Sequence, residues 1–424
     1  MKKMYATGKQ QDRCLLVGIE NPGQSDEENS RDIIELARLV ETAGGIACAS
    51  RTQMLKKADP ATFLRKGKIR EIKQYIKQND IDALVFDEEL TPHQIRNLEQ
   101  FLDMKIVDRT ELILHIFSRN ARTRLAKLEV ELAKMQYTLP RLKRMWTHLS
   151  RQKGGIGLKG PGERQIELDR RIILKKIAHI KKSLERIKRG MDIRQRKRSN
   201  TYIISLVGYT NSGKSSLLAR LAEQPVLVAD QLFSTLDTLV RPVALNEQRT
   251  VLFSDTVGFI RKLPLQLVNS FYATLAEILS SDLIIHVVDI SNRDFERQMQ
   301  AVEETLYQIG TQAIPIMNAF NKIDRLDRQA LSVRLEGNRR RASVRISALT
   351  GENVPQLKQR VLQFIHSLEE KLRFKLLLQD QQGLALLHQV GEVVEVKKAD
   401  GFVAVDAYIA PARLHLVAHL PHGR

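Results

Sequence analysis

One stretch of the chain places glycines, a lysine and a serine at a spacing that suits phosphate binding. The apolar run YIISLV leads directly into GYTNSGKSSLLARL, which puts Gly208, Gly213, Lys214 and Ser215 in the pattern G-x-x-x-x-G-K-S. Glycines let backbone N–H groups curl around a phosphate, and the helix that follows adds the partial positive charge of its N-terminus. We expect Lys214 to reach the β- and γ-phosphates of a nucleotide and the Ser215 hydroxyl to ligate Mg²⁺. The other contacts expected from this loop are Tyr209, Thr210, Asn211, Ser212 and Ser216.

A second set of candidate residues follows the loop. The run VLFSDTVGF places Asp255 at a strand end, with Gly258 three residues later. In this arrangement a carboxylate holds Mg²⁺ through water, and a glycine amide senses the γ-phosphate. In the polar connection ADQLFSTLDTLVRPVAL we expect Thr235, with Thr238 as the alternative, to close over the metal and the γ-phosphate. The expected metal ligands are Ser215, Thr235 and Asp255, the expected catalytic residues are Lys214, Thr235 and Gly258, and Thr256 and Val257 add nucleotide contacts.

Polar residues at two later strand ends predict which base is bound. IPIMNAFNKID ends in Asn321, Lys322 and Asp324, and VRISAL ends in Ser347, Ala348 and Leu349. The Asp324 carboxylate can accept from guanine N1–H and the 2-amino group, a donor pattern that adenine lacks. Lys322 can lie along the base, Asn321 can brace the pocket, and the Ala348 amide can reach guanine O6.

These motifs are informative together rather than singly. Each of the last two alone fits ordinary turn chemistry. Four motifs in order, each at the carboxyl edge of a strand, predict an enzyme that binds GTP and hydrolyses it to GDP and phosphate. Phe259 follows Gly258 where many GTPases keep a glutamine that orients water, and a phenyl ring cannot do this. We therefore expect slow intrinsic hydrolysis and a bound partner that completes the site.

The chain of 424 residues is long enough to supply several domains around these motifs. Alternating apolar runs and helical patterns predict an N-terminal α/β domain in residues 1–118. The GTPase domain covers 201–370, and a small α+β domain with one helix and two or three strands covers 371–424. The predicted fold class is α/β, with a P-loop GTPase domain preceded by an N-terminal α/β domain and a helical coiled-coil hairpin.

Residues 119–190 change to a heptad-like period on both sides of a glycine-rich stretch. Apolar residues there step by three and four, which indicates two helices that bury a common seam. The first is expected over Ala121–Leu149, and the two fold back on each other with Gly154–Gly162 at their tip. Residues 191–200 are then a polar basic linker.

Most of the formal net charge of +19 lies in this hairpin, because Ala121 to Arg198 contain 24 Lys or Arg against 7 Asp or Glu. Such a block indicates a polyanion partner, nucleic acid ahead of anionic membrane, with a solvated helix face as the alternative. A flexible connector is the simplest alternative for the tip, but a hairpin needs only about two to five residues there. The expected RNA and ribosome contacts are Arg151, Lys153, Gly154, Gly155, Gly157, Lys159, Gly160, Gly162 and Arg164.

The number of cysteines and the hydropathy of the chain indicate the compartment in which the protein works. Cys14 and Cys48 are the only cysteines, which excludes a disulfide framework and favours a reducing compartment. The longest apolar run, near Leu283 to Val288, is too short to span a bilayer. We expect a cytoplasmic protein, with peripheral but no stable inserted membrane association, and a monomer.

Several segments together resemble the HflX family of ribosome-associated GTPases. They are KGGIGLKGPGERQIELDRR, SLVGYTNSGKSSLL, QLFSTLD, DTVGFIRKLP and NKID, with FDEELTPHQIRNLE and VDRTELILHIFSRNARTRLAKLEVELA in the N-terminal part. The resemblance implies binding to the large (50S) ribosomal subunit and its rRNA, and splitting or rescue of stalled 70S ribosomes, for example under heat stress. It also implies K⁺ as a second cation beside Asn211.

Two positions depart from the family pattern. Arg164 replaces a common threonine and adds to the positive tip, and the family's N-terminal IGxGK appears as LRKGK at Leu64–Lys68, so we predict no second nucleotide site there. The leading hypothesis is that the GTP-bound protein docks on the large subunit and that hydrolysis drives release. The alternatives are a ribosome-assembly GTPase acting on precursor large subunits, and an RNA-binding module that uses GTP only as a switch.

Overall fold

The structure is a computed structural model of the chain. It describes residues 11–20, 22–23, 26–142, 161–197, 201–224, 232–233, 237–262, 264, 272–327, 331, 343–399 and 401–423. Two compact units make up the chain. The first consists of Met1–Arg194 with Ala229–Asp237 and Ile260–Ala276, and the second of Gln195–Val228 with Thr238–Phe259 and Glu277–Arg424.

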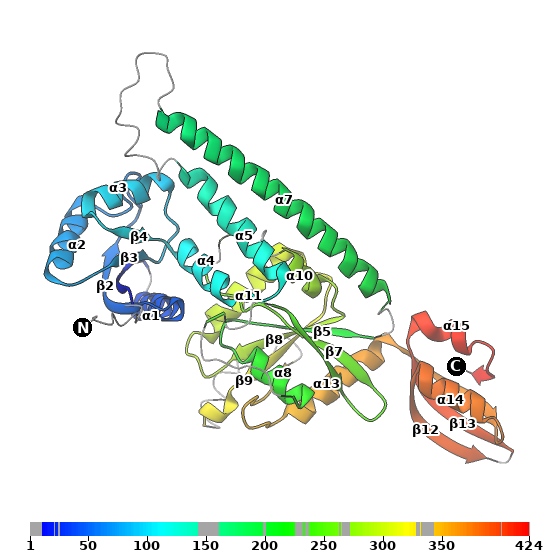
Figure 1. Cartoon of the computed structure of the whole chain (residues 1–424). Coiled ribbons are helices and arrows are strands. Elements are labelled where there is room, and N and C mark those ends of the chain that lie inside the picture. The colour runs from blue at the N-terminus through cyan, green and yellow to red at the C-terminus, as the bar shows by residue number, and fades with distance from the viewer. Residues whose placement is uncertain are drawn as a thin grey trace, which may run out of the picture. The chain divides into compact units, whose positions relative to one another are not determined.

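The first unit begins with a four-stranded parallel sheet in the order β2-β1-β3-β4 (Figure 1). Its strands are β1 (Arg13–Glu20), β2 (Ile46–Met54), β3 (Ala83–Phe86) and β4 (Lys105–Val107), and its helices are α1 (Asp26–Ala43), α2 (Lys66–Gln78), α3 (Pro92–Leu102) and α4 (Arg109–Asn120). The predicted α/β alternation is confirmed. Thr91 caps α3 in a capping box with Gln94, and Pro92 occupies the first helical turn, where its missing N–H costs nothing.

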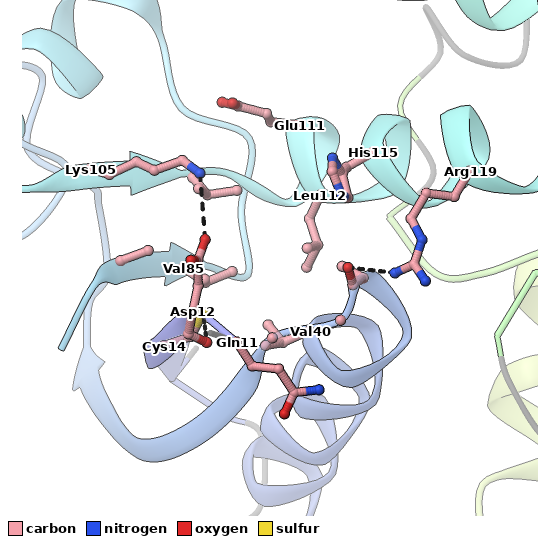
Figure 2. Close-up of a pocket in the computed structure, with 15 residues that line it drawn as sticks. Gln11, Asp12, Cys14, Val40, Val85, Lys105, Glu111, Leu112, His115 and Arg119 are labelled. Carbon is pink, nitrogen blue, oxygen red and sulfur yellow. Dashed lines mark hydrogen bonds and ion pairs between the residues drawn. The ribbon is translucent and has the colours of Figure 1, made fainter. Parts of the chain in front are cut away.

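Alternation along the strands sends side chains to both faces of this sheet. Leu15 and Phe86 pack against α2 and α3 in one core, while α1 and α4 pack against each other. On their side a cavity of about 710 Å³ is lined by Cys14, Lys105 and His115 among others (Figure 2). Burial raises the pKa of the Cys14 thiol to about 11, which keeps it protonated. Arg119 donates to the carbonyls of Thr42 and Ala43 and so caps the end of α1.

The helical hairpin follows the sheet in the chain and lies in the first unit up to Arg194. It consists of α5 (Arg124–Thr138), a 3₁₀ turn η1 (Leu139–Arg141) and the long helix α7 (Pro161–Lys197), which run side by side in Figure 1. Leu132 of α5 packs against Ile177, Ile180 and Leu184 of α7, which is the predicted heptad seam.

Three details of the predicted hairpin are wrong. Helix α5 begins at Arg124, capped by Thr123, and gives way to a 3₁₀ turn after Thr138, because Pro140 lacks the N–H that an α-helix needs. Helix α7 already begins at Pro161, so Gly162 and Arg164 lie in its first turn and not in a loop. Residues 191–197 continue α7 instead of forming a linker, because arginine, glutamine and lysine are good helix formers. Arg151 to Gly160 lie outside the described residues.

The second unit contains a six-stranded sheet in the order β10-β9-β8-β5-β7-β6. All neighbours are parallel except the pair of β6 and β7. The strands are β5 (Ile203–Val207), β6 (Leu239–Ala244), β7 (Thr250–Asp255), β8 (Leu283–Asp289), β9 (Ile316–Asn321) and β10 (Ser343–Arg345). The helices are α8 (Lys214–Ala222), α11 (Phe295–Ile309) and α13 (Val354–Leu368), and a 3₁₀ turn η3 (Ile323–Arg325) follows β9. Helix α10 (Tyr272–Leu279) is divided between the two units after Ala276. The central strands are buried on both faces, as expected for a parallel sheet covered by helices.

A smaller α+β fold follows at the C-terminal end. Its sheet has the order β12-β13-β11-β14, all antiparallel. The elements are β11 (Glu370–Leu377), α14 (Gln381–Val390), β12 (Glu392–Ala399), β13 (Phe402–Ile409), η4 (Pro411–Arg413), α15 (Leu414–Val417) and β14 (His422–Gly423). The sequence predicts one helix and two or three strands here, so the short α15 and β14 are additions. No described helix of either unit is both long and apolar enough to cross a membrane.

Candidate nucleotide-binding site

The candidate site lies at the carboxyl end of β5, where the chain turns into α8. Lys214 opens that helix with 6% of its surface exposed. Its ammonium group donates to the carbonyl oxygens of Gly208 at 3.1 Å and Tyr209 at 2.9 Å. Burial lowers the pKa of Lys214 to about 8, with the nearby Asp255 opposing this shift and Lys322 adding to it. The lysine is therefore held inside the loop, where a phosphate would restore its preference for the charged form.

Two loop glycines are required by close packing. A Cβ on Gly208 would lie 2.2 Å from the Val287 carbonyl oxygen, and one on Gly213 would lie 2.2 Å from the Asn321 side-chain nitrogen. Both have positive φ, 155° and 93°, a region that other residues rarely adopt. A side chain at Gly208 would displace β8 at Val287, and one at Gly213 would displace Asn321, so the tight loop depends on glycine.

Hydroxyl and carboxylate oxygens converge beside the loop. Ser215 Oγ donates to Asp255 Oδ2 at 2.6 Å, and Asp255 is fully buried at the end of β7. Oxygen donors of this kind are the ligands that Mg²⁺ prefers. The hydroxyls of Thr210 and Ser212 are buried and have no hydrogen-bond partner among the described residues. Because buried hydroxyls are normally satisfied, these two point to a polar ligand in the loop.

The segment after Asp255 runs beside the loop. Thr210 N–H donates to the Phe259 carbonyl at 2.7 Å, and Phe259 N–H donates to the Gly208 carbonyl at 3.0 Å. A Cβ on Gly258 would lie 3.1 Å from the Lys214 ammonium nitrogen, so the backbone of Gly258 sits next to the group expected to hold phosphate. The Phe259 ring is 2% exposed, which leaves it packed in the core and unable to orient water.

The predicted base-binding residues meet at the ends of β9 and β10. Asn321 donates to the Ser212 carbonyl at 2.8 Å and accepts from the Ala348 N–H at 2.9 Å, so it ties the two predicted motifs to the loop. Ser347 Oγ donates to Asp324 Oδ1 at 2.6 Å. That hydrogen bond orients the carboxylate that we expect to read guanine.

Two residues of this site were not predicted. Asp289, at the end of β8, forms an ion pair with Lys322 at 2.7 Å, while the same ammonium donates to the Asn211 carbonyl at 2.8 Å. Arg220 of α8 donates to the carbonyls of Ala348 and Leu349. Asp289 ends an apolar strand as Asp255 does, and that signal was available in the sequence. Arg220 carries no such signal, since only folding brings α8 under the last loop.

The remaining predicted residues are only partly described. Thr256 donates from its hydroxyl to the Leu206 carbonyl at 2.8 Å and so faces the core of the sheet. Leu349 is 73% exposed, directly after Ala348. Thr235 lies outside the described residues, and Thr238, the alternative, directly precedes β6.

Comparisons with known proteins agree with this arrangement. Family models described as GTP-binding GTPase N-terminal, GTP-binding GTPase Middle Region and 50S ribosome-binding GTPase match residues 30–118, 120–198 and 203–322. The GTPase HflX of Magnetococcus marinus is 41% identical over 97% of this chain and 95% of its own length. The chain belongs to the HflX family. The GTPase HflX of Escherichia coli is 40% identical over 79% of both chains.

Among solved structures, a GTP-binding protein of Sulfolobus solfataricus in complex with GDP is 26% identical, with 85% of this chain and 100% of that chain covered and a TM-score of 0.43. Membership of the HflX family makes this chain a GTPase, with hydrolysis of GTP as its activity. The predicted family, fold class and enzyme class are confirmed. GTPases of this kind generally use Mg²⁺.

Proposed function

We propose that this HflX-family GTPase binds the large ribosomal subunit in its GTP state and splits or rescues stalled 70S ribosomes in the cytoplasm. Hydrolysis of GTP then drives release. The family model for residues 203–322 carries the description 50S ribosome-binding GTPase. The observation that carries the proposal within this chain is the basic hairpin, since affinity for rRNA comes mainly from contacts of Lys and Arg with phosphates.

The described part of α7 supports a polyanion partner. Its seam with α5 buries apolar side chains, and its remaining surface is exposed and largely basic. The exposed cations are Arg170, Arg171, Lys175, Lys176, Lys181, Lys182, Arg186 and Arg189. Only a few carboxylates lie among them, so the ion pairs of Arg171 with Glu167 and of Lys176 with Glu131 leave a large positive excess.

In the nucleotide site we propose these roles. Lys214 binds the β- and γ-phosphates, and Gly258 supplies the amide that senses the γ-phosphate. Mg²⁺, held by Ser215 and, through water, by Asp255, neutralises phosphate charge in the transition state. The paired Asp324 and Ser347 read guanine. The proposal for Asp324 is supported by its orientation toward the base-side loop.

The test is cosedimentation with ribosomal subunits in the presence of a non-hydrolysable GTP analogue. The intact chain is compared with a chain that lacks residues 154–162, and with one in which the same glycine segment is replaced by an uncharged linker of equal length. We expect the intact chain to sediment with the large subunit and both altered chains to bind at least 10-fold more weakly, because the charge of Lys159 and the backbone fit of the glycine-rich segment to RNA are lost together.

The outcomes separate the three hypotheses. Binding to neither subunit overturns the ribosomal function. Stronger binding to precursor than to mature large subunits favours the assembly role. If subunits are bound but do not accelerate GTP hydrolysis, the chain uses GTP only as a switch, and the proposed hydrolysis-driven release is wrong.

A further inference from the structure

Arg220, in the last turn of α8, reaches from its own helix to the loop that follows β10. Its Nε donates to the Ala348 carbonyl at 3.4 Å, and its Nη2 donates to the Leu349 carbonyl. A Cβ added to Gly351 would lie 3.7 Å from the same Nε, so the guanidinium also rests against the end of this loop. One side chain of the second unit thus contacts three positions of the turn at residues 347–351.

The simplest reading of Arg220 is that it serves its own helix. A cation in the last turn interacts favourably with the partial negative charge of a helix C-terminus. Within the described part of the chain, however, the guanidinium donates only to the carbonyls of Ala348 and Leu349. Its planar, fixed donors can span two successive carbonyls, which suits an arginine better than a lysine. The contact therefore serves the turn and not the end of α8.

The turn uses almost all of its backbone donors internally. Among the described residues, four of the five N–H groups of residues 347–351 have a partner and that of Leu349 has none. The four bonds, of 2.9–3.1 Å, run from Ser347 to the Glu352 carbonyl, from Ala348 to Asn321 Oδ1, from Thr350 to Ser347 Oγ, and from Gly351 to the Ser347 carbonyl. Leu349 is also exposed, so the Leu349 amide is the donor that this turn can offer to a ligand.

Arg220 sets the direction of that amide. The Leu349 N–H and the Ala348 carbonyl belong to one planar peptide group, in which they point in opposite directions. Because Arg220 holds the Ala348 carbonyl toward α8, the Leu349 N–H faces away from that helix. The next peptide group is fixed at both ends, with the Leu349 carbonyl on Arg220 and the Thr350 N–H on Ser347. Without the arginine, the first of these peptide groups loses the contact that orients it.

The same turn orients the carboxylate expected to read guanine. Ser347 Oγ donates to Asp324 Oδ1 at 2.6 Å. In guanine the O6 acceptor adjoins N1–H, so a donor is needed beside the carboxylate that binds N1–H. The Ala348 amide, which the sequence suggests for O6, is already bonded to Asn321. The Leu349 amide is the neighbouring donor that remains available.

We propose that Arg220 is a positioning residue for guanine recognition: it holds the Leu349 amide in the orientation that donates to O6 of the base. This inference rests on the proposed guanine pocket and names the group that reads O6 there. Adenine carries an amino group in place of O6, so it leaves this amide without an acceptor. Helix α8 begins at Lys214, which we expect to hold the phosphates, and reaches Arg220 six residues, or about 9 Å, later. One helix then supports recognition of both ends of the nucleotide.

The test compares the full chain with Arg220→Met for affinity to GDP, IDP and the diphosphate of 2-aminopurine riboside. GDP and IDP both carry O6, whereas 2-aminopurine keeps the 2-amino group and lacks O6. We expect Arg220→Met to lose about 5- to 10-fold for GDP and IDP alike, as for one hydrogen bond, and less than about 2-fold for the 2-aminopurine nucleotide. Arg360→Met removes another exposed arginine of the second unit and should change none of the three affinities. Isothermal titration calorimetry measures them.

Three results overturn the proposal. An equal loss for all three nucleotides shows that Arg220 only stabilises the domain or attracts phosphate. A loss for GDP without one for IDP shows that it acts through the 2-amino group, and an unchanged GDP affinity shows that it positions nothing. The guanine pocket itself is tested in the parent chain. If the parent binds the 2-aminopurine nucleotide as tightly as GDP, the proposed reading of guanine by Asp324 fails, whatever Arg220 does.

Discussion

Lys214 is the residue whose protonation state nucleotide binding should change most. Its pKa, about 8 in the nucleotide-free chain against 10.5 ordinarily, reflects burial without a phosphate partner. A group whose folded pKa is depressed in this way binds fewer protons in the native than in the unfolded state between those values. The free energy of unfolding of the nucleotide-free protein should therefore gain a favourable contribution as pH rises from about 8 to 10.5.

The nucleotide should reverse that effect, because phosphate charge favours the ammonium form. We expect GDP binding at pH 8.5 to 9 to take up close to one proton and to weaken as pH rises further. Isothermal titration calorimetry in two buffers of different ionisation enthalpy measures the uptake. Lys214→Ala should abolish both the proton uptake and most of the GTP turnover while the fold remains. Equal proton uptake in parent and variant contradicts the assignment to Lys214.

Asp324 allows a prediction about base choice. Replacing it with Asn exchanges one carboxylate acceptor for an amide donor, which fits the 2-oxo group of xanthine better than the 2-amino group of guanine. We expect Asp324→Asn to lose about 100-fold or more in GTP affinity and to prefer xanthosine triphosphate, because the N1–H and 2-amino donors of guanine lose an acceptor. Competition binding with both nucleotides checks this. Retained preference for GTP would exclude Asp324 as the guanine reader.

For single residues, the sequence predicts those site residues that lie in contiguous motifs. Lys214, Asn321 and Ser347 occur in the site because their motifs end strands of one sheet, and parallel strands bring their carboxyl ends to one edge. Arg220 could not be found this way. It reaches the carbonyls of the last loop from the last turn of α8, a contact that depends on how the helix packs and not on spacing.

The apolar seam between α5 and α7 allows a prediction about the stability of the hairpin. Ile180 is 2% exposed between α5 and α7, whereas Leu174 on the same helix is 44% exposed. Ile180→Ala removes buried methyl groups and leaves a cavity, so we expect it to cost about 2–4 kcal/mol. Leu174→Ala should change stability by less than about 0.5 kcal/mol. Hydrogen exchange along α5 and α7, read by mass spectrometry, measures the local effect, and equal protection in the two variants contradicts the seam.

Heptad spacing predicts this pairing but not where the helices end. The apolar period runs through Pro140 without a break, so periodicity alone extends the first helix past the point where the missing N–H stops it. The period also fades before Lys197, yet α7 continues because helix formers without an apolar stripe still prolong a helix that is already nucleated. Element ends depend on single backbone groups, whereas element type depends on a pattern of many residues.

At the scale of the whole molecule, the sequence predicts domain order but not domain membership. Residues 260–276 fall within the predicted GTPase domain, 201–370, yet they belong to the same compact unit as the N-terminal sheet. The deciding contacts, such as that of Arg261 with Asp32, join residues more than two hundred positions apart. Nothing in the local pattern of an Arg-Lys pair indicates which distant carboxylate it will meet.

Within the second unit, a buried charge cluster joins the GTPase fold to the C-terminal domain. Arg249, 12% exposed, pairs with Glu369 at 2.7 Å and with Glu392 at 3.2 Å. Tyr202 donates to Glu369, and His366 stacks on Tyr408 while contacting Glu392. Burial raises the pKa of Glu369 even though Arg249 opposes the shift. The arginine therefore neutralises two carboxylates that the fold has already removed from water.

Removing that arginine should make the unit sensitive to pH. In Arg249→Met the pKa of Glu369 in the folded protein rises further above its value in the unfolded chain. The folded state is then stabilised by the protonated Glu369 at low pH and loses that stabilisation as pH rises through the folded pKa. We expect Arg249→Met to cost about 3–5 kcal/mol at pH 8, as for other broken buried pairs, and clearly less at pH 5. Urea unfolding at both pH values measures this, with the exposed Arg360→Met of α13 as the control. The two variants remove the same charge. An equal loss of unfolding free energy in both, or a loss in Arg249→Met that is the same at both pH values, would show that Arg249 does not hold the two folds together.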